Sequence, residues 1–548
     1  MATTMPGLSF KSRGRPAEPS PLHTDVAGFL GRTGRGPLGG AVRVEGWRRF
    51  ERDFGGLRRD RTLTYALRGY FENGGKVAYV VRIAGEDRRD HLIAGAAWDL
   101  RPWLDRPDVY APIRPDPRST APRAYLVRAS SPGTWGHGIT VEVTVRMVTL
   151  GGPDDAAPRR IPEVDLTIRT PDGEAEYFRN LDPTVTDQFE SDGRGRTMAS
   201  RIAEDSVFIR LEPVETLAEG LPKVSERRAG TGELALAIPP EAPPVPDLAQ
   251  QYARAIRDLG DAPEVALLAV PALHEDFDDE DRRDAIIRGL MQQAADLLDR
   301  QLLIDGPPGA VDSVAMLRHV ERLRSLAEVA HLRRASALYH PWLRVRDPFG
   351  GSANPLRDVP PSGHVAGAIS RTDRARGAHH TPANVPIFDA ADLDVAYSSP
   401  DDGQLAAAGV NLIRCQPGRG LMIWGGRTLE PMPDGRYLTH RRLLHRLVRS
   451  IRRVCEPIVF DANGPQLWFQ MARSVTSVLL DAFRMGALQG DRPEEAFRVR
   501  CDEQTNPPES RDLGRAICEV GVAPAVPMEF ITLRVALSAT KQLEVFDE

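Results

Sequence analysis

The chain has 548 residues, too many for a single hydrophobic core, so two to four domains are expected. Its hydrophobic content of 41%, charged content of 27% and net charge of -5 are typical of soluble globular proteins and exclude a protein whose whole surface binds nucleic acid. The longest nearly apolar run, 265–273, is too short to cross a bilayer, and the N-terminus shows no secretory signal. We therefore expect a cytoplasmic protein without direct membrane insertion.

The N-terminal quarter begins with an arm and continues into an α/β pattern. Residues 1–24 are rich in proline and glycine, which predicts an extended arm without a helix or a central strand. A short apolar strand is expected over 26–31 and a buried strand over 77–83. Between these strands, the pattern predicts helices over 46–54 and 63–73.

A different pattern begins at about residue 106. Short alternating segments, such as 140–145 and 164–169, are separated by Gly, Pro and Asp turns, which is typical of a small β-rich domain. The proline-rich stretch 238–246 ends this domain as an extended linker, and an α/β pattern then resumes. The sequence therefore predicts an α/β body at 25–105 and 247–420 with a β-rich insertion at 106–246.

The last third alternates between strands and helices, predicting a C-terminal domain at 421–527. The expected elements, in chain order, are a strand at 421–424, a helix at 439–454, a strand at 458–460, a helix at 466–488 and strands at 497–501 and 518–522. Four cysteines are scattered singly without a C-x-x-C pair, so reduced thiols are expected; they are Cys415, Cys455, Cys501 and Cys518.

The clearest strand of the chain is expected at 530–537, near its end. Its apolar side chains alternate with polar ones and follow two prolines; they are Phe530, Ile531, Leu533, Val535 and Leu537. A lone strand is not stable in water, so this segment must pair with a sheet of its own subunit or of a neighbouring one. We predict that residues 528–548 form a strand-donating arm.

Motifs that would carry enzymatic chemistry are weak in this sequence. Residues 34–39 match G-x-G-x-x-G, but Pro37 removes a backbone N–H and strand-like residues follow instead of a helix. His379 and His380 are adjacent and lack the helical spacing of metal ligands. We therefore expect no enzyme activity, no cofactor and no metal site, although acids and bases that meet only in space leave a catalytic pair open.

Several segments together resemble the contractile tail sheath family of phage tails, type VI secretion systems and phage-tail-like injection particles. Their order and spacing extend over nearly the whole chain. The segments are 26–33 (VAGFLGRT), 65–75 (YALRGYFENGG), 131–136 (SPGTWG), 339–343 (YHPWL), 359–367 (VPPSGHVAG), 424–429 (WGGRTL) and 519–524 (EVGVAP). The residues after the first Pro-Gly are less β-branched than in that family.

The resemblance implies an α/β, multi-domain fold with a mixed-sheet sheath core, an inserted β-rich domain and extended arms at both ends. It implies hexameric rings that stack into a helical sheath around an inner tube, assembled in the bacterial cytoplasm, with baseplate and terminal cap proteins as further partners. Strand addition between subunits would use the C-terminal residues named above and, in the N-terminal arm, Leu8 and Phe10. Arg511 and Arg515, expected one helical turn apart, are candidate contacts to the tube.

Two alternatives from other classes remain open at this point. One is a soluble α/β enzyme with a β-rich lid insertion, and the other is a static shell or baseplate protein. The sequence does not distinguish a phage tail from a secretion system or a free particle.

Overall fold

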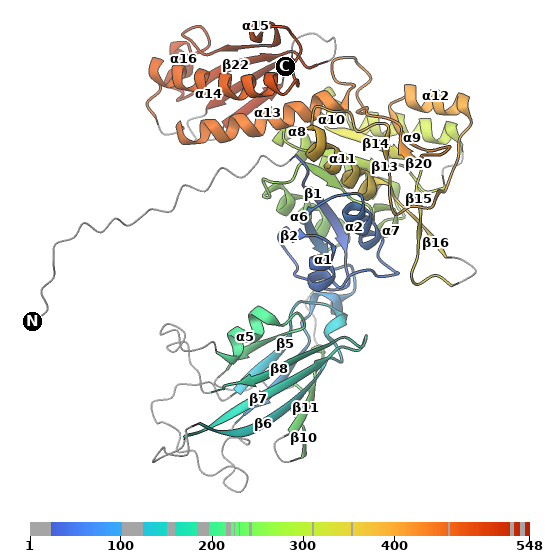
Figure 1. Cartoon of the computed structure of the whole chain (residues 1–548), viewed down its shortest axis with the longest axis vertical. Helices are drawn as coiled ribbons and strands as arrows, with labels where there is room; N and C mark the ends of the chain where they lie inside the picture. Colours follow the sequence, from blue (N-terminus) through green and yellow to red (C-terminus); the bar gives the residue numbers. More distant parts are fainter. Residues whose placement is uncertain are drawn as a thin grey trace, which may run out of the picture.

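A computed structural model gives the fold of the chain. It describes residues 24–100, 124–150, 159–183, 197–214, 221–223, 225–228, 231–240, 244–309, 312–351, 355–458, 461–525, 531–537 and 543–547. The arm predicted at 1–24 lies almost entirely outside these residues, as do Leu8, Phe10 and Phe530. Three parts follow one another along the long axis: a β-rich part, a central body and a C-terminal domain (Figure 1).

The central body is built on a nine-stranded sheet in the order β17-β20-β19-β14-β13-β12-β1-β3-β2. Its middle strands are parallel, whereas β2, β20 and β17 pair antiparallel at the two ends. The strands of this sheet are β1 (Ala27–Arg32), β2 (Val42–Glu45), β3 (Val77–Ile83), β12 (Leu267–Ala269), β13 (Gln301–Asp305), β14 (Ser336–His340), β17 (Val385–Pro386), β19 (Val410–Gln416) and β20 (Gly420–Ile423). The predicted mixed sheet is therefore confirmed.

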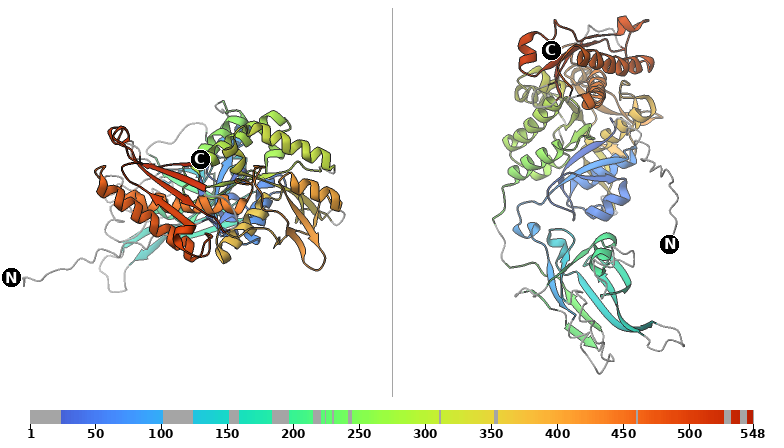
Figure 2. Two further views of the ribbon diagram at one scale, coloured as in Figure 1. Left: turned by 90° about the horizontal axis from the view of Figure 1, so that it is seen from above. Right: turned by 90° about the vertical axis from the view of Figure 1, so that its left-hand side faces the viewer.

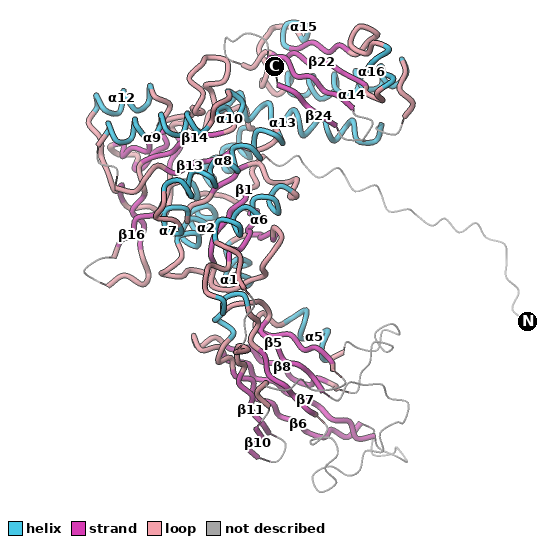
Figure 3. Tube along the Cα trace, turned by 180° about the vertical axis from the view of Figure 1, so that it is seen from behind, coloured by secondary structure: helices cyan, strands magenta, loops and turns pink. Residues whose placement is uncertain are grey.

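Helices cover both faces of this sheet, so the body has three layers, with helices on either side of the strands in Figure 3. One face carries α6 (Leu248–Gly260), α8 (Glu280–Leu297), α9 (Ser313–Leu326), α10 (Ala330–Arg334) and α12 (Ser399–Ala407). The other carries α1 (Trp47–Phe54), α2 (Thr62–Glu72) and α11 (Ser362–Arg376). Successive side chains of a strand point to opposite faces of the sheet. On β12, Leu268 therefore packs against the helices of the first face, and Leu267 packs against those of the other. Shorter elements complete the body: η1 (Arg88–His91), α7 (Leu273–Asp276), β15 (Leu343–Arg346), β16 (Leu356–Val359) and β18 (Asp392–Leu393).

Helices α2 and α11 are in backbone contact. A Cβ atom added at Gly363 would lie 2.2 Å from the carbonyl oxygen of Ala66, and one at Gly367 would lie 2.3 Å from that of Tyr70. No side chain fits at either position without separating the helices. This explains why the glycines of the segment 359–367 stand where they do.

The β-rich part is an insertion between β3 and α6 and consists of two sheets, drawn in cyan to green in Figure 1. One sheet has the order β4-β5-β9 and the other β10-β11-β6-β7-β8. The elements are β4 (Gly95–Asp99), β5 (Ala124–Ala129), η2 (Thr134–Gly136), β6 (Thr140–Leu150), β7 (Arg159–Arg169), β8 (Ala175–Leu181), α5 (Met198–Asp205), β9 (Ile209–Pro213), β10 (Ser225–Arg228) and β11 (Thr231–Ala235).

The insertion begins before residue 106, the predicted boundary. Strand β4 pairs antiparallel with β5 over its full length, and Trp98 on β4 is fully buried in the core of the insertion. The sequence pattern missed β4 because its residues, GAAWD, include no β-branched side chain. Gly95 also bridges to Ala237, so the chain enters and leaves the insertion at adjacent points.

The C-terminal domain has a four-stranded sheet in the order β21-β22-β23-β24 and two long helices packed on it. Its elements are α13 (Leu438–Cys455), η3 (Glu456–Ile458), α14 (Pro465–Arg484), α15 (Pro493–Ala496), β21 (Phe497–Arg500), α16 (Pro508–Asp512), β22 (Ala516–Val522), β23 (Ile531–Leu537) and β24 (Leu543–Asp547). Figure 2 shows this domain at the opposite end of the body from the insertion.

Two predictions for this region differ from the structure. The strand at 421–424 belongs to the body sheet as β20, because it pairs with β19 and β17, so the domain starts later than residue 421. The strand predicted at 458–460 is wrong at Ile458, which ends the 3-10 turn η3; residues 459–460 lie outside the described residues. Pro457 explains this difference, since its fixed φ suits a helical turn directly after α13.

Candidate assembly interface

The predicted strand near the end of the chain exists and lies inside the C-terminal sheet. β23 pairs antiparallel with β22 in a register that runs from Ile531↔Val522 to Leu537↔Ala516. On its other side it pairs with β24, which the sequence analysis did not predict. Ile531, Leu533, Val535 and Leu537 thus occupy register positions opposite β22 of the same chain. In the structure, β23 thus pairs with a strand of its own subunit. Pairing with a strand of a neighbouring subunit stays a prediction.

The hydrogen bonds of β22 alternate between its two neighbouring strands. On the β21 side, Ile517 donates its N–H to the side-chain oxygen of Asn506 and accepts from the Asn506 amide at 2.9 Å. Ala523 N–H donates to the carbonyl oxygen of Ala496 at 2.8 Å, just before β21. Because backbone groups alternate along a strand, odd-numbered residues of β22 face β21 and even-numbered ones face β23. The pairs Cys518↔Val535 and Val520↔Leu533 are therefore the hydrogen-bonded ones in the β22–β23 ladder.

The predicted pair of tube contacts is not arranged as expected. Helix α16 ends at Asp512, so Arg511 lies on the helix and Arg515 lies beyond it, after Gly514 with a φ of 67°. Both side chains are exposed, but the guanidinium of Arg511 lies 6.0 Å from the ring centroid of Trp468. Gly514 ends the helix before Arg515 can stack over Arg511, so the two do not form one helical face.

Buried arginines of α13 join the C-terminal domain to the body. Arg442 makes a bidentate ion pair with Asp373 of α11, and the side chains of both are 2% exposed. Arg449 donates to the carbonyl oxygens of Asp299 and Glu264, each at 3.0 Å. Burial lowers the pKa of Arg449 to about 10. A buried guanidinium requires fixed partners, so these bonds define how α13 sits on the body sheet.

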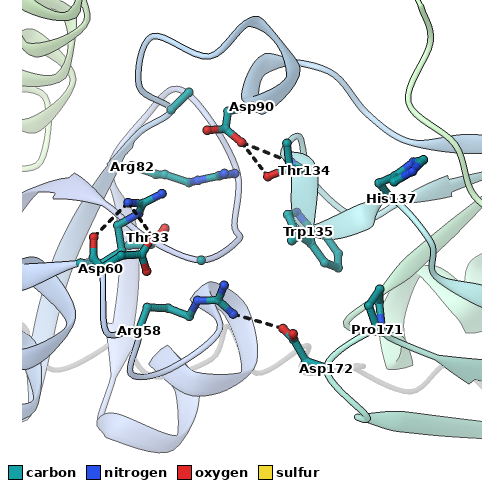
Figure 4. Close-up of a pocket in the computed structure, with 13 residues that line it drawn as sticks. Thr33, Arg58, Asp60, Arg82, Asp90, Thr134, Trp135, His137, Pro171 and Asp172 are labelled. Atoms are coloured by element: carbon teal, nitrogen blue, oxygen red, sulfur yellow. Dashed lines mark hydrogen bonds and ion pairs between the residues drawn. The ribbon is translucent and has the colours of Figure 1, made fainter. Parts of the chain in front are cut away.

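A second junction joins the insertion to the body and lines a partly open cavity of about 240 Å³ (Figure 4). Arg58 of the body pairs with Asp172 of the insertion at 3.1 Å, and Thr134 of the insertion donates to Asp90 at 2.9 Å. Arg82 at the end of β3 reaches across and donates to the carbonyl oxygen of Pro132 at 2.7 Å. Its burial lowers the pKa of Arg82 to about 10.

The junction attaches the insertion to the body through polar contacts. Its contacts are ion pairs and hydrogen bonds between two folded parts, as in polar inter-domain interfaces. Asp60 and Asp172, the other acids of the cavity, are each paired with an arginine, Arg61 and Arg58.

The segments considered for chemistry lie in loops. Residues 34–39 lie between β1 and β2, with no helix directly after them. The ring centroids of His379 and His380 are 4.4 Å apart, and both residues lie in the loop after α11. Across the described ranges, no group of three or more His, Cys, Asp and Glu side chains is placed to hold a metal ion. In that same portion of the chain, no helix combines the length and apolarity of a membrane span.

Sequence comparison identifies the central part of the body. Residues 249–429 match the phage tail sheath protein central domain. The tail sheath protein of Vibrio phage KVP40 is 26% identical over 188 residues, which cover 34% of this chain and 27% of that protein. The match thus spans about a quarter of the relative's length. The resemblance to the contractile tail sheath family is confirmed.

Structural comparison extends the likeness to nearly the whole chain. A sheath tail protein from Listeria innocua has a TM-score of 0.59 at 11% identity, covering 94% of this chain and 95% of that one. A sheath tail protein from Desulfitobacterium hafniense has a TM-score of 0.54 at 11% identity, covering 97% and 100%. The helical sheath of the anti-feeding prophage in its contracted state gives 0.53 at 20% identity, covering 97% and 98%. The three parts of the fold thus recur together.

Proposed function

We propose, because residues 249–429 match the central domain of phage tail sheath proteins, that this chain is the structural sheath subunit of a contractile injection apparatus. Its subunits polymerise as stacked hexameric rings around an inner tube and contract to drive the tube into a target. The further partners are the tube protein, the baseplate and a terminal cap. The role is structural and not enzymatic, and assembly takes place in the bacterial cytoplasm.

A second observation, the place of β23 and β24 in the C-terminal sheet, supports this proposal. They complete the C-terminal sheet through register pairs with β22, after a chain segment that contains Pro524 and Pro527. Strands in this register could instead pair with the β22 edge of a neighbouring subunit, which is strand addition. One such ladder is modest, at roughly 0.5–1.5 kcal/mol per hydrogen bond. Many ladders in a lattice act together through multivalency.

Negative-stain electron microscopy of the purified full-length protein tests the proposal. Tubes or sixfold rings are the expected result. Closed shells would instead indicate a static capsid-like protein, and compact particles at all concentrations would contradict self-assembly.

The insertion is expected to be dispensable for polymerisation. Replacing residues 93–239 with a short Gly/Ser linker should leave tube formation intact, because the insertion has its own hydrophobic core and its ends meet at the Gly95–Ala237 bridge. Microscopy and size-exclusion chromatography of the shortened protein measure this. Loss of all assembly in a soluble, folded protein would show that the insertion takes part in the lattice.

A matched control uses the boundaries 106–246 that the sequence suggested. This second replacement leaves β4 in place without its partner β5 and exposes Trp98, which is 0% exposed in the intact chain. An orphaned strand with an uncovered tryptophan is an aggregation hazard, so poor solubility is expected. Equal behaviour of the two proteins would contradict the assignment of β4 to the insertion.

Arg511 and Arg515 remain candidates for contact with the tube, as separate exposed charges rather than one helical face. Reversing both, with Arg511→Glu and Arg515→Glu, is expected to reduce co-purification of tube protein while rings still form, since each subunit would lose its pairing with acidic groups. The matched control reverses two exposed arginines of the insertion, Arg146→Glu and Arg169→Glu. Undiminished tube binding by the first variant would exclude this contact.

A further inference from the structure

Two of the four cysteines face each other across the C-terminal sheet. The register of β21 and β22 ends with Arg500 opposite Glu519, and its continuation by one residue places Cys501 opposite Cys518; the two thiols are in hydrogen-bonding contact. Cys518 is fully buried and Cys501 partly buried, and both pack in the hydrophobic core beneath α13 and α14. The two side chains therefore share one face of the sheet and point into the same core.

The hydrogen-bond alternation of β22 decides how close this pair is. Ile517 and Ala523 direct their backbone groups toward β21, so the even-numbered Cys518 directs its own toward β23. Cys501 and Cys518 are therefore a non-hydrogen-bonded pair, the kind in which Cα atoms are about 4.5 Å apart and side chains are closest. That separation falls within the roughly 4.4–6.8 Å range of disulfides.

The two thiols are chemically unequal. A hydrogen bond from the Cys518 thiol lowers the pKa of Cys501, whereas the same contact and burial raise the pKa of Cys518. The Asn506 side-chain amide lies 3.9 Å from the Cys501 sulfur and adds to the stabilisation of its thiolate. Cys501, the more accessible of the pair, is thus the better nucleophile, and Cys518 is placed to resolve what forms on it.

We propose that Cys501 and Cys518 form a redox-active pair that closes to a cross-strand disulfide when the protein meets a small-molecule disulfide such as oxidised glutathione. The Cys501 thiolate attacks one sulfur of the oxidant, and one thiolate leaves. Cys518 gives its proton to the thiolate released in the first step and attacks the Cys501 sulfur, so the second thiolate leaves. Two protein thiols are oxidised, and one disulfide is reduced to two thiols.

The other two cysteines are poor competitors. Cys455 at the end of α13 is buried near the pair, and burial raises its pKa to about 12, but it lies on a helix and not at the register position opposite Cys501. Cys415 is exposed on β19, in the body sheet and away from the C-terminal core. The disulfide would join β21 covalently to β22, and β22 is the strand with which β23 pairs. An oxidising medium would therefore hold β22 in place for that pairing, and a reducing medium would remove the covalent bond.

Peptide mapping of the full-length protein tests the pair directly. Each cysteine falls in its own tryptic peptide: 501–511 and 516–534 for the pair, 415–419 and 454–473 for the other two. After incubation of the folded protein with oxidised glutathione, alkylation and digestion, we expect 501–511 linked to 516–534 with a mass deficit of two hydrogen atoms. Dithiothreitol should abolish the link.

Controls separate the proposed pairing from nonspecific oxidation. A Cys415→Ser variant should form the same link to the same extent, and Cys501→Ser should leave Cys518 in reduced form. The same oxidation in concentrated urea should yield mixed pairings, because the sheet no longer selects the partner. A stable glutathione adduct on Cys501 without the link, or linkage of Cys501 to Cys455 in the folded protein, would overturn the proposal.

Discussion

A chain truncated after Met528 is expected to stay folded in its body and insertion and to form no long sheaths. The truncation removes β23 and β24, and with them seven register pairs on β22. It removes no residue of the hydrophobic cores of the body or the insertion. The remaining sheet ends at β22. The backbone groups of its even-numbered residues then have no β23 to pair with, either from the same subunit or from a neighbouring one. Size-exclusion chromatography with electron microscopy measures the result, and normal contractile tubes would refute strand exchange for this chain.

Two proline variants of β23 give a graded form of the same experiment. Val535 directs its N–H toward β22, because it pairs with Cys518 in the hydrogen-bonded register, whereas Arg534 directs its N–H toward β24. Val535→Pro and Arg534→Pro thus impose the same ring but remove different bonds, each contributing about 0.5–1.5 kcal/mol. We expect Val535→Pro to shorten sheaths far more than Arg534→Pro. Equal effects would show that the β22–β23 ladder does not limit assembly.

Breaking the buried ion pair between α13 and α11 should destabilise the union of the C-terminal domain and the body. Arg442→Met leaves the Asp373 carboxylate buried without its partner, which costs about 3–5 kcal/mol. Hydrogen exchange of α13 measures this locally, and amide protection there should fall on the order of 100-fold or more, since each 1.4 kcal/mol is about tenfold. Unchanged protection would show that the pair does not hold the two parts together.

Two further variants calibrate that result. Arg484→Met removes an exposed partner of Asp481, with side chains 72% and 64% exposed, and should cost less than about 0.5 kcal/mol. The double variant Arg442→Met with Asp373→Leu removes both buried charges and should recover most of the lost stability, because an apolar pair no longer leaves a charge unpaired.

The elements predicted from the sequence are those in which the pattern of apolar side chains alone indicates a buried strand or helix face. Strand β3 is found at the expected residues, since Val77, Tyr79, Val80, Val81 and Ile83 leave no alternative to a buried strand. Helix α13 was recognised from leucines such as Leu443 and Leu447, which recur on one face and are buried. In both cases the local pattern and the tertiary environment agree.

What depends on distant partners was not predictable in this way. Arg442 and Asp373 are 69 residues apart, and nothing in either segment marks the other. β24 was missed because a five-residue strand is visible only beside the strand that it pairs with. The partner of β23 was left open for the same reason, since period-two alternation describes a face of a strand and not the neighbour across its edge.

The bridge between Gly95 and Ala237 makes the length of the inserted chain almost irrelevant to the body. Joining two points that already touch costs loop-closure entropy that grows only with the logarithm of the loop length, about 0.6 kcal/mol for each doubling. A foreign domain whose own termini are close together could therefore replace the β-rich part without straining β3 or α6. A lattice of such subunits would display that guest in a regular helical array, with one copy for every subunit.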